Sequence, residues 1–258
     1  MMTAASTGAI YPDLADKTVV VTGGGTGIGE AIVRRFAAQG AKTAFIDIKE
    51  AESRALADEL SAQGRRVYFE QADLTDIAAL RAAIGNIRGE FGPIQILINN
   101  AAHDERHAAL DVTPDYWDDR IAVNLKHQFF AAQAVLPDMM EAKAGSIINF
   151  GSTSWMVGQG GMAAYTAAKS GVLGLTRSLA RDFGAYNIRV NAIAPGWIMT
   201  QRQIDLWLNP AAEAELMQRQ CLKRKLVPDE IARATLFFAS DEASACTNQQ
   251  YVVDGGWV

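Results

Sequence analysis

The stretch TVVVTGGGTGIG, residues 18–29, decides the fold. Its first five residues are all β-branched, which is typical of a strand buried on both faces of a parallel sheet. Glycines follow at once, and the chain then enters the helical pattern GEAIVRRFAAQG of residues 29–40. A strand, a tight glycine turn and a helix N-terminus, with a second strand within about 30 residues, predict a loop that holds the pyrophosphate of a dinucleotide.

Three glycines in this loop have separate expected roles. Gly23 permits the turn, Gly27 lets the backbone approach a pyrophosphate, and Gly29 allows the helix to pack close to the strand. Asp47 ends the second expected strand, 18 residues after Gly29. A carboxylate at this point accepts hydrogen bonds from the adenosine ribose and repels a 2′-phosphate. NAD is therefore the expected cofactor, with NADP as the alternative.

Short runs rich in Val and Ile alternate with longer helical patterns along the chain. This alternation predicts right-handed crossovers and a parallel sheet. The fold class is therefore α/β, with one doubly wound domain over residues 1–258 and helices on both faces of about seven strands. Gly40 and Gly64 are placed to end the first two helices. Residues 197–228 break the alternation and predict a lid of one or two helices. The expected strands are 18–22, 42–47, 66–72, 94–99, 146–150, 188–194 and 251–254.

Composition excludes several classes of protein. Apolar residues make up 49% and charged residues 21% of the chain, an ordinary ratio for a globular domain. The net charge of −5, without a Lys/Arg cluster, argues against nucleic acid as a partner. Residues 1–14 lack the features of a signal peptide, and no stretch of the chain is apolar enough to span a membrane. The two cysteines are too few to form a disulfide framework. We expect a cytoplasmic protein that has no membrane partner.

Tyr165 and Lys169 lie four residues apart in YTAAK, at the head of a small-residue helical pattern. Positions i and i+4 share one helix face, so both side chains reach the same volume. Taken alone, this spacing more often means an exposed aromatic residue beside a solvated lysine. The motifs in the rest of the chain change this interpretation.

These motifs, in their order and spacing, resemble the short-chain dehydrogenase/reductase family, and the resemblance covers residues 14–258. It implies a Rossmann domain that binds NAD(P) and an enzyme that transfers hydride between this cofactor and a CH–OH group of its substrate. The matching residues are TGGGTGIG (22–29), Asp73-Leu74, NNA (99–101), Asn124, Ser152, Tyr165 with Lys169, and Pro195-Gly196.

The resemblance implies a role for each catalytic residue. Tyr165 is the general acid or base. A Lys169 ammonium beside it, together with the positive nicotinamide ring of the oxidised cofactor, lowers the pKa of the phenol from its ordinary value of about 10, and Lys169 also binds the nicotinamide ribose. Ser152 holds the reacting oxygen. Asn124, inside the helical pattern that begins at Thr113-Pro114, relays protons from Lys169 to solvent through water; an asparagine that simply faces water is the alternative.

The same resemblance implies which residues bind the cofactor. Asp73 and Leu74 lie where the adenine ring is held, although Asp73 alternatively caps the next helix. Ile198 meets the nicotinamide carboxamide, and Thr200 meets the pyrophosphate. The full expected set is Gly23, Thr26, Gly27, Ile28, Gly29, Asp47, Ile48, Asp73, Leu74, Asn100, Tyr165, Lys169, Pro195, Gly196, Ile198 and Thr200.

The polar run HDERH, residues 103–107, follows the fourth expected strand and predicts a substrate rim, with a solvated loop as the alternative. Its two histidines suggest a metal, but without a third ligand in reach we expect none. Indole faces pack on the C–H surfaces of sugars, while amides and carboxylates bind their hydroxyls. The expected substrate residues are His103, Asp104, Ser154, Trp155, Gln159, Trp197 and Arg202, with a weaker suggestion for Gln203.

Within the family, one combination of segments resembles the bacterial aldose 1-dehydrogenases, which act on D-xylose, L-arabinose, D-galactose or L-fucose. The resemblance implies oxidation of a free sugar at its anomeric hydroxyl to an aldonolactone, and a homotetramer in which long helices pair. Another alcohol or polyol dehydrogenase, or a 3-oxoacyl-type ketone reductase, is the alternative. A regulator that binds NAD without catalysis would be expected to lack some of the catalytic residues, and all of them are present here. The segments are AIYPDL (9–14), NNAAHDERH (99–107), INFGSTSW (148–155), QCLKRKLVP (220–228) and ASACT (243–247).

Overall fold

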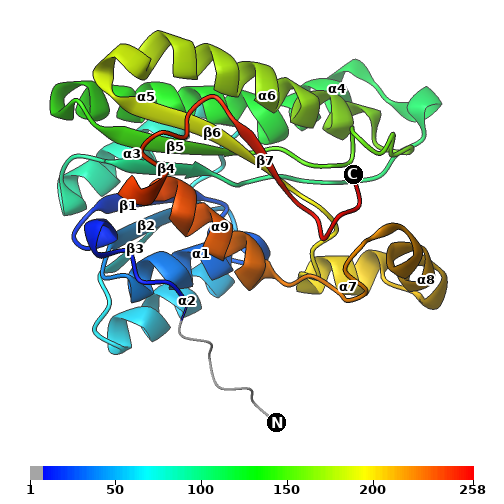
Figure 1. Ribbon diagram of the computed structural model, residues 1–258. Coiled ribbons are helices and arrows are strands. Elements are labelled where there is room, and N and C mark those ends of the chain that lie inside the picture. The colour runs from blue at the N-terminus through cyan, green and yellow to red at the C-terminus, as the bar shows by residue number, and fades with distance from the viewer. Residues whose placement is uncertain (1–7) are drawn as a thin grey trace.

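A single sheet forms the centre of the protein (Figure 1). The computed structural model describes residues 8–258, so residues 1–7 of the predicted domain lie outside it. The sheet has seven parallel strands in the order β3-β2-β1-β4-β5-β6-β7, which confirms the predicted doubly wound α/β fold. The strands are β1 (Thr18–Thr22), β2 (Lys42–Asp47), β3 (Val67–Gln71), β4 (Ile96–Asn99), β5 (Gly145–Phe150), β6 (Ile188–Pro195) and β7 (Gln250–Val253).

Helices cover both faces of the sheet, as strands that are apolar on both sides require. They are α1 (Gly27–Ala38), α2 (Glu50–Ala62), α3 (Ile77–Phe91), α4 (Pro114–Ile121), α5 (His127–Ala142), α6 (Ala163–Phe183), α7 (Gln201–Trp207), α8 (Pro210–Arg219) and α9 (Pro228–Ala239). On one face α1 and α9 bury Phe36 and Ile231, and on the other face α3 and α5 bury Ile84 and Val135. Within residues 8–258, no helix has both the length and the apolar character that crossing a membrane requires.

The order of the strands fixes where a ligand can bind. β1 lies between β2 and β4, and the chain order reverses at this point. A crevice opens beyond the carboxyl ends of strands at such a reversal. The register pairs Thr22 with Ile46 on one side and with Asn99 on the other. The glycine loop after β1 therefore meets the chain that leaves β4.

Helix ends follow the sequence signals, with one exception. Gly40 and Gly64, just beyond α1 and α2, have φ angles of +82° and +75°, in the left-handed region that favours glycine. Thr113 caps α4, because its Oγ1 accepts a hydrogen bond from Tyr116 N at 3.2 Å. The pattern that starts there is not one helix, however. A π-helical segment, Ala122–Lys126, separates α4 from α5, and such segments are frequent at functional sites.

Residues 197–228, which the sequence predicts to be a lid, follow β6 and contain α7 and α8. α7 and α8 project from one end of the sheet (Figure 1). A β-bridge between Ile198 and Leu226 joins the two ends of the segment, and Cys221 N and Leu222 N attach it to the C-terminal chain by donating to the oxygens of Gly256 and Gly255, each at 2.9 Å. We call residues 197–228 the lid.

Candidate active site

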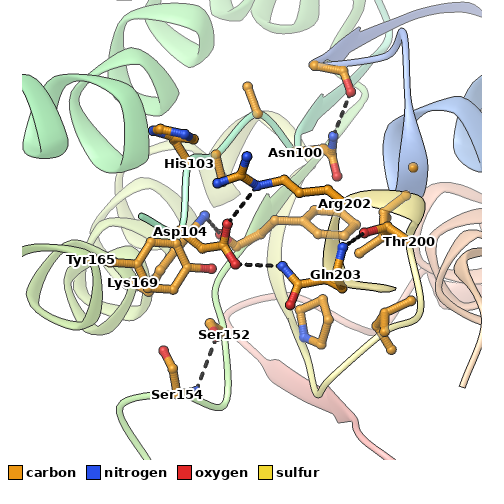
Figure 2. A pocket seen from close by; sticks show the side chains of 18 of the residues that line it. Asn100, His103, Asp104, Ser152, Ser154, Tyr165, Lys169, Thr200, Arg202 and Gln203 are labelled. Atoms are coloured by element: carbon orange, nitrogen blue, oxygen red, sulfur yellow. Dashed lines mark hydrogen bonds and ion pairs between the residues drawn. The ribbon is translucent and has the colours of Figure 1, made fainter. Parts of the chain in front are cut away.

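A cavity of about 1300 Å³ opens at the carboxyl edge of the sheet and extends to the lid. It is lined by Ser152, Tyr165 and Lys169, and Figure 2 shows these side chains together. All the residues predicted to bind the cofactor also line this cavity. Asn124 is not among the lining residues. The sequence therefore identified one continuous site from residues spread over most of the chain.

The glycine loop has the backbone that an anion site requires. Gly23 and Gly27 have φ angles of +66° and +63°, which other residues adopt only with strain. A Cβ atom on Gly29 would lie 1.8 Å from the Gly23 oxygen, so α1 packs against the loop closely enough to exclude any side chain. Thr26 precedes α1, and its side chain forms no cap hydrogen bond to the helix. The first N–H groups of α1 thus remain for a phosphate group.

Asn100 holds this loop in place. Its Nδ2 donates to the oxygens of Gly23 at 2.9 Å and Thr22 at 3.1 Å. Its main-chain N donates to the Thr22 Oγ1 at 3.0 Å. The residue therefore ties the end of β4 to the turn after β1, a positioning role that the sequence did not predict.

Asp47 is fixed where the second strand ends. Its Oδ2 accepts from Gly25 N at 2.8 Å, and its Oδ1 accepts from Lys49 N at 2.9 Å. A Cβ atom on Gly25 would lie 2.2 Å from Ser53 Oγ and 3.0 Å from Asp47 Oδ2. The loop therefore has no room for a side chain beside this carboxylate. The helix N-terminus and the fixed carboxylate suit a nicotinamide dinucleotide, with the phosphates at α1 and the adenosine ribose at Asp47.

Asp73 does not cap the helix that follows it, so that alternative was wrong. α3 is capped by Asp76, whose Oδ1 accepts from Ala78 N at 2.8 Å and Ala79 N at 3.1 Å. Asp73 Oδ1 instead accepts from the main-chain N and the hydroxyl of Thr75, at 2.9 and 2.8 Å. This turn leaves Asp73 at the edge of the cavity.

Tyr165 and Lys169 lie on one face of α6, with Lys169 buried and Tyr165 half-buried. The Lys169 Nζ lies 5.8 Å from the centroid of the Tyr165 ring and donates to the Phe150 oxygen at 2.7 Å. Lys169 is only 1% exposed, and burial lowers the pKa of its ammonium to about 7. The expected lowering of the Tyr165 pKa does not occur in the protein alone. Burial and then the charge of Asp104 raise the pKa of this phenol, and the Ser152 hydroxyl opposes them.

The buried lysine predicts a specific pH dependence of stability. Between pH 7 and 10.5 the unfolded chain keeps a proton on Lys169 that the folded chain has lost. Unfolding then takes up a proton, so the free energy of unfolding should rise with pH across this window. Urea unfolding at several pH values measures it. Lys169→Met should flatten the rise, while Lys126→Met, at an exposed position, should keep it; equal slopes in wild type and Lys169→Met would contradict the assignment.

Ser152 and Ser154 lie in the loop after β5. The Ser152 Oγ accepts a hydrogen bond from Ser154 N at 3.1 Å. Both residues line the cavity, and the Ser154 Oγ is buried without a hydrogen-bond partner within residues 8–258. The Ser152 hydroxyl is thus oriented by the backbone, and a substrate oxygen can meet it beside Tyr165.

The side chain of Asn124 forms hydrogen bonds to the backbone around it. Its Oδ1 accepts from His103 N at 2.9 Å, and its Nδ2 donates to the oxygens of His103 at 3.1 Å and Arg120 at 2.9 Å. The alternative of an asparagine that faces water was wrong, because this residue is fully buried. Its side chain joins the π segment to the loop after β4, and so fixes the residues that precede Asp104.

Asp104 connects that loop to the lid (Figure 2). Its Oδ1 accepts from Arg202 Nε at 3.1 Å, and its Oδ2 accepts from Gln203 Nε2 at 2.6 Å. The Gln203 Oε1 in turn accepts from Trp197 Nε1 at 2.9 Å. Thr200 caps α7 through Gln203 N at 3.3 Å, and its methyl group would lie 3.1 Å from a Cβ on Gly27. The start of the lid therefore faces both the glycine loop and the rim.

Most of the predicted substrate residues line the cavity, namely His103, Asp104, Ser154, Gln159, Trp197 and Arg202. Trp155 is not among the lining residues, and its indole N–H is buried in the turn beyond Ser154. Sequence reasoning missed Trp257, and it missed Trp207, whose ring lies 4.1 Å from the Arg106 guanidinium carbon. Within residues 8–258, no three His, Cys, Asp or Glu side chains form a cluster that could hold a metal.

Comparisons with known proteins cover nearly the whole chain. The family described as "Enoyl-(Acyl carrier protein) reductase" matches residues 23–258. "Probable galactose dehydrogenase GalD" from Rhizobium meliloti (strain 1021) is 48% identical over 95% of this chain and 96% of its own length. D-xylose 1-dehydrogenase from Caulobacter vibrioides (strain NA1000 / CB15N) is 45% identical over 96% of this chain and 98% of its own. The crystal structure of gox2181 has a TM-score of 0.91 at 31% identity, over 95% of this chain and 98% of that one.

Proposed function

The chain belongs to the short-chain dehydrogenase/reductase family and is an oxidoreductase; from this premise we propose that it oxidises the anomeric hydroxyl of a free aldose to the aldonolactone and passes the hydride to NAD. Two relatives named as sugar dehydrogenases, at 48% and 45% identity over nearly all of the chain, support this substrate class. The 3-oxoacyl reductase alternative has less support.

The observation that carries the proposal is the Asp104 carboxylate beside Tyr165. Arg202 and Gln203 hold it, and its charge acts on the Tyr165 phenol. A carboxylate only accepts hydrogen bonds, so it favours a substrate that presents a second hydroxyl near the reacting one. In an aldose the carbon next to the anomeric carbon, C2, carries such a hydroxyl. An acyl chain offers no donor at this point.

We assign the chemical roles as follows. Tyr165 removes the proton of the anomeric hydroxyl, and the Ser152 hydroxyl donates to the same oxygen and orients it. The Lys169 ammonium stabilises the phenolate that Tyr165 becomes. Asn124 positions the loop of Asp104 rather than exchanging protons through its side chain. When bound, NAD supplies the carbon that accepts hydride from C1 of the sugar.

A labelled substrate tests where the hydride comes from. An aldose carrying deuterium at C1 should give deuterated NADH and slower turnover, because the labelled bond is the one that breaks. The same sugar deuterated at C2 is the matched control and should give unlabelled NADH. Label transfer from C2 instead of C1 would contradict anomeric oxidation while leaving the dehydrogenase activity intact.

The preference for NAD over NADP is part of the proposal, and Asp47 carries it. The carboxylate is held by two main-chain N–H groups and is 8% exposed, so it cannot turn away from a 2′-phosphate. Gly24, Gly25 and Thr26 offer no cation to offset the repulsion.

Asp47→Ala should therefore raise kcat/KM for NADP relative to that for NAD by at least about tenfold, because it removes both the repulsion and the ribose hydrogen bonds. Initial rates with each cofactor at saturating aldose measure the ratio. Asp58→Ala, an exposed position on α2, removes the same charge and should leave the ratio unchanged. An unchanged ratio in Asp47→Ala would mean that this carboxylate does not bind the ribose.

We also propose a homotetramer in the cytoplasm. Phe129 on α5 is 40% exposed. Phe237 and Tyr251 are 37% and 54% exposed, and both pack against the Phe238 ring. Grouped exposed aromatic side chains support two contact surfaces between copies. The free thiols of the two cysteines suit a reducing compartment. Light scattering of the purified protein measures the stoichiometry.

A further inference from the structure

We propose that Gln128 is a positioning residue for Lys169: buried behind the cavity, its side-chain amide fixes the main-chain oxygen on which the Lys169 ammonium rests. The inference rests on the proposed function, in which that ammonium assists Tyr165. Gln128 does not line the cavity and belongs to none of the motifs that identify the family.

The geometry joins Gln128 to Lys169 through one shared acceptor. The Phe150 oxygen, at the carboxyl end of β5, accepts from Lys169 Nζ at 2.7 Å and from Gln128 Nε2 at 3.4 Å. The same Nε2 donates to the Asn124 oxygen at 3.3 Å. A single amide thus connects the π segment, the end of β5 and the catalytic lysine.

The backbone that carries this amide is itself fixed. The Gln128 oxygen accepts from Asn99 Nδ2 at 3.1 Å, and Asn99 Nδ2 also donates to Asn149 Oδ1 at 2.9 Å. The Asn149 Nδ2 donates to Thr176 Oγ1 at 3.0 Å on α6. All of these residues are fully buried. The polar chain crosses from α5 through β4 and β5 to α6, the helix of Lys169.

A contribution to folding stability does not by itself explain why a glutamine lies at position 128. Gln128 is fully buried, and its Oε1 has no hydrogen-bond partner within residues 8–258. A buried polar atom without a partner costs free energy, whereas an apolar side chain of the same shape would not. The two hydrogen bonds of its Nε2 are also long. The benefit of the amide therefore lies in where it holds the Phe150 oxygen.

The effect on Lys169 has a definite sign. The amide N–H directs the positive end of its dipole at the oxygen that binds the ammonium, and this disfavours the charged lysine. Removing the amide should therefore raise the pKa of Lys169 from about 7. The titratable groups around Lys169 are Tyr165 on α6, Asp104 on the loop after β4 and His127 on α5. Burial and the Lys169 charge lower the pKa of His127 to about 3, so it stays neutral in this range.

The test is Gln128→Met, which keeps the length of the side chain and removes the amide. The midpoint pH of the part of the kcat–pH profile that reports the titration of Lys169 should rise by about half a pH unit or more. The value of kcat should fall at least about fivefold. In the Lys169→Met background, Gln128→Met should change the remaining kcat less than about twofold, because a residue that acts through Lys169 has no further effect there. Thr235→Val, at a fully buried position on α9 outside this polar chain, should leave the pH profile unchanged.

A second readout needs no substrate. The pH at which the free energy of unfolding begins to rise reports Lys169, and it should move upward in Gln128→Met. This shift separates failure of the inference from failure of the proposed function, since it survives even without aldose turnover. Gln128→Glu, which keeps the shape of the side chain and adds a negative charge, should move it further. An unmoved pH dependence in both variants, or an equal loss of kcat with and without Lys169, would overturn the inference.

Discussion

Tyr165→Phe should lower kcat for aldose oxidation by about 10²- to 10⁴-fold, the usual contribution of a positioned general base. The change removes one oxygen atom, and the hydroxyl of the substrate then loses the group that takes its proton. The ring stays beside Lys169 on α6, so the packing around Lys169 should persist. Initial rates of NADH formation measure kcat directly.

Measuring the Kd for NADH distinguishes a variant that has lost only its catalytic activity from one that has also lost its cofactor site. Trp197, Trp207 and Trp257 line the cavity, so energy transfer from tryptophan to bound NADH reports the Kd. We expect nearly the same Kd in Tyr165→Phe as in the wild type. Tyr186→Phe, at an exposed position outside the cavity, should keep full activity. Turnover near the wild-type rate in Tyr165→Phe would remove this residue from the proposed mechanism.

Gly29→Ala should weaken NADH binding at least about 100-fold, because the phosphate contacts depend on the position of the loop. The new Cβ atom would lie 1.8 Å from the Gly23 oxygen and 2.8 Å from Asn100 Nδ2. The Gly23 oxygen is a backbone atom, so α1 and the loop must move apart. The N–H groups at the start of α1 then no longer converge on a phosphate. Energy transfer to NADH measures the Kd.

The matched control is Gly85→Ala on α3, where an added Cβ atom meets nothing within 4 Å. Alanine is the better helix former, so this variant should bind NADH normally and be at least as stable as the wild type. A Kd for NADH in Gly29→Ala equal to that of Gly85→Ala would show that the loop does not hold the pyrophosphate.

The sheet and the cofactor residues followed from the sequence because their signals are local. Strands buried on both faces must be apolar throughout, and the turn after β1 needs glycine at Gly23 and Gly27, where φ is positive. Residues from distant parts of the chain then meet, because parallel strands end at the same edge of the sheet. The order of the motifs along the chain therefore predicted which residues lie together in the cavity.

Other features depend on packing that a local pattern does not contain. The π segment at Asn124 leaves the apolar pattern of the helices intact, so one helix was expected there. The pKa of Tyr165 depends on burial and on the charge of Asp104, and both raise it. Trp155 and Trp207 are equally suited to a sugar by residue type. The fold of the lid brings Trp207 to the cavity, whereas Trp155, in the turn after β5, is not among the lining residues.

The proposed oxidation of a free aldose at C1 with NAD is tested by the initial rate of NADH formation by purified protein across a panel of aldoses. Simple alcohols and polyols serve as comparison substrates, and the lactone is identified as product. We expect turnover of one or a few aldoses, release of aldonolactone, and no comparable rate with the other alcohols. NADH binding without turnover of any aldose, together with reduction of a 3-oxoacyl thioester by NADH, would contradict it.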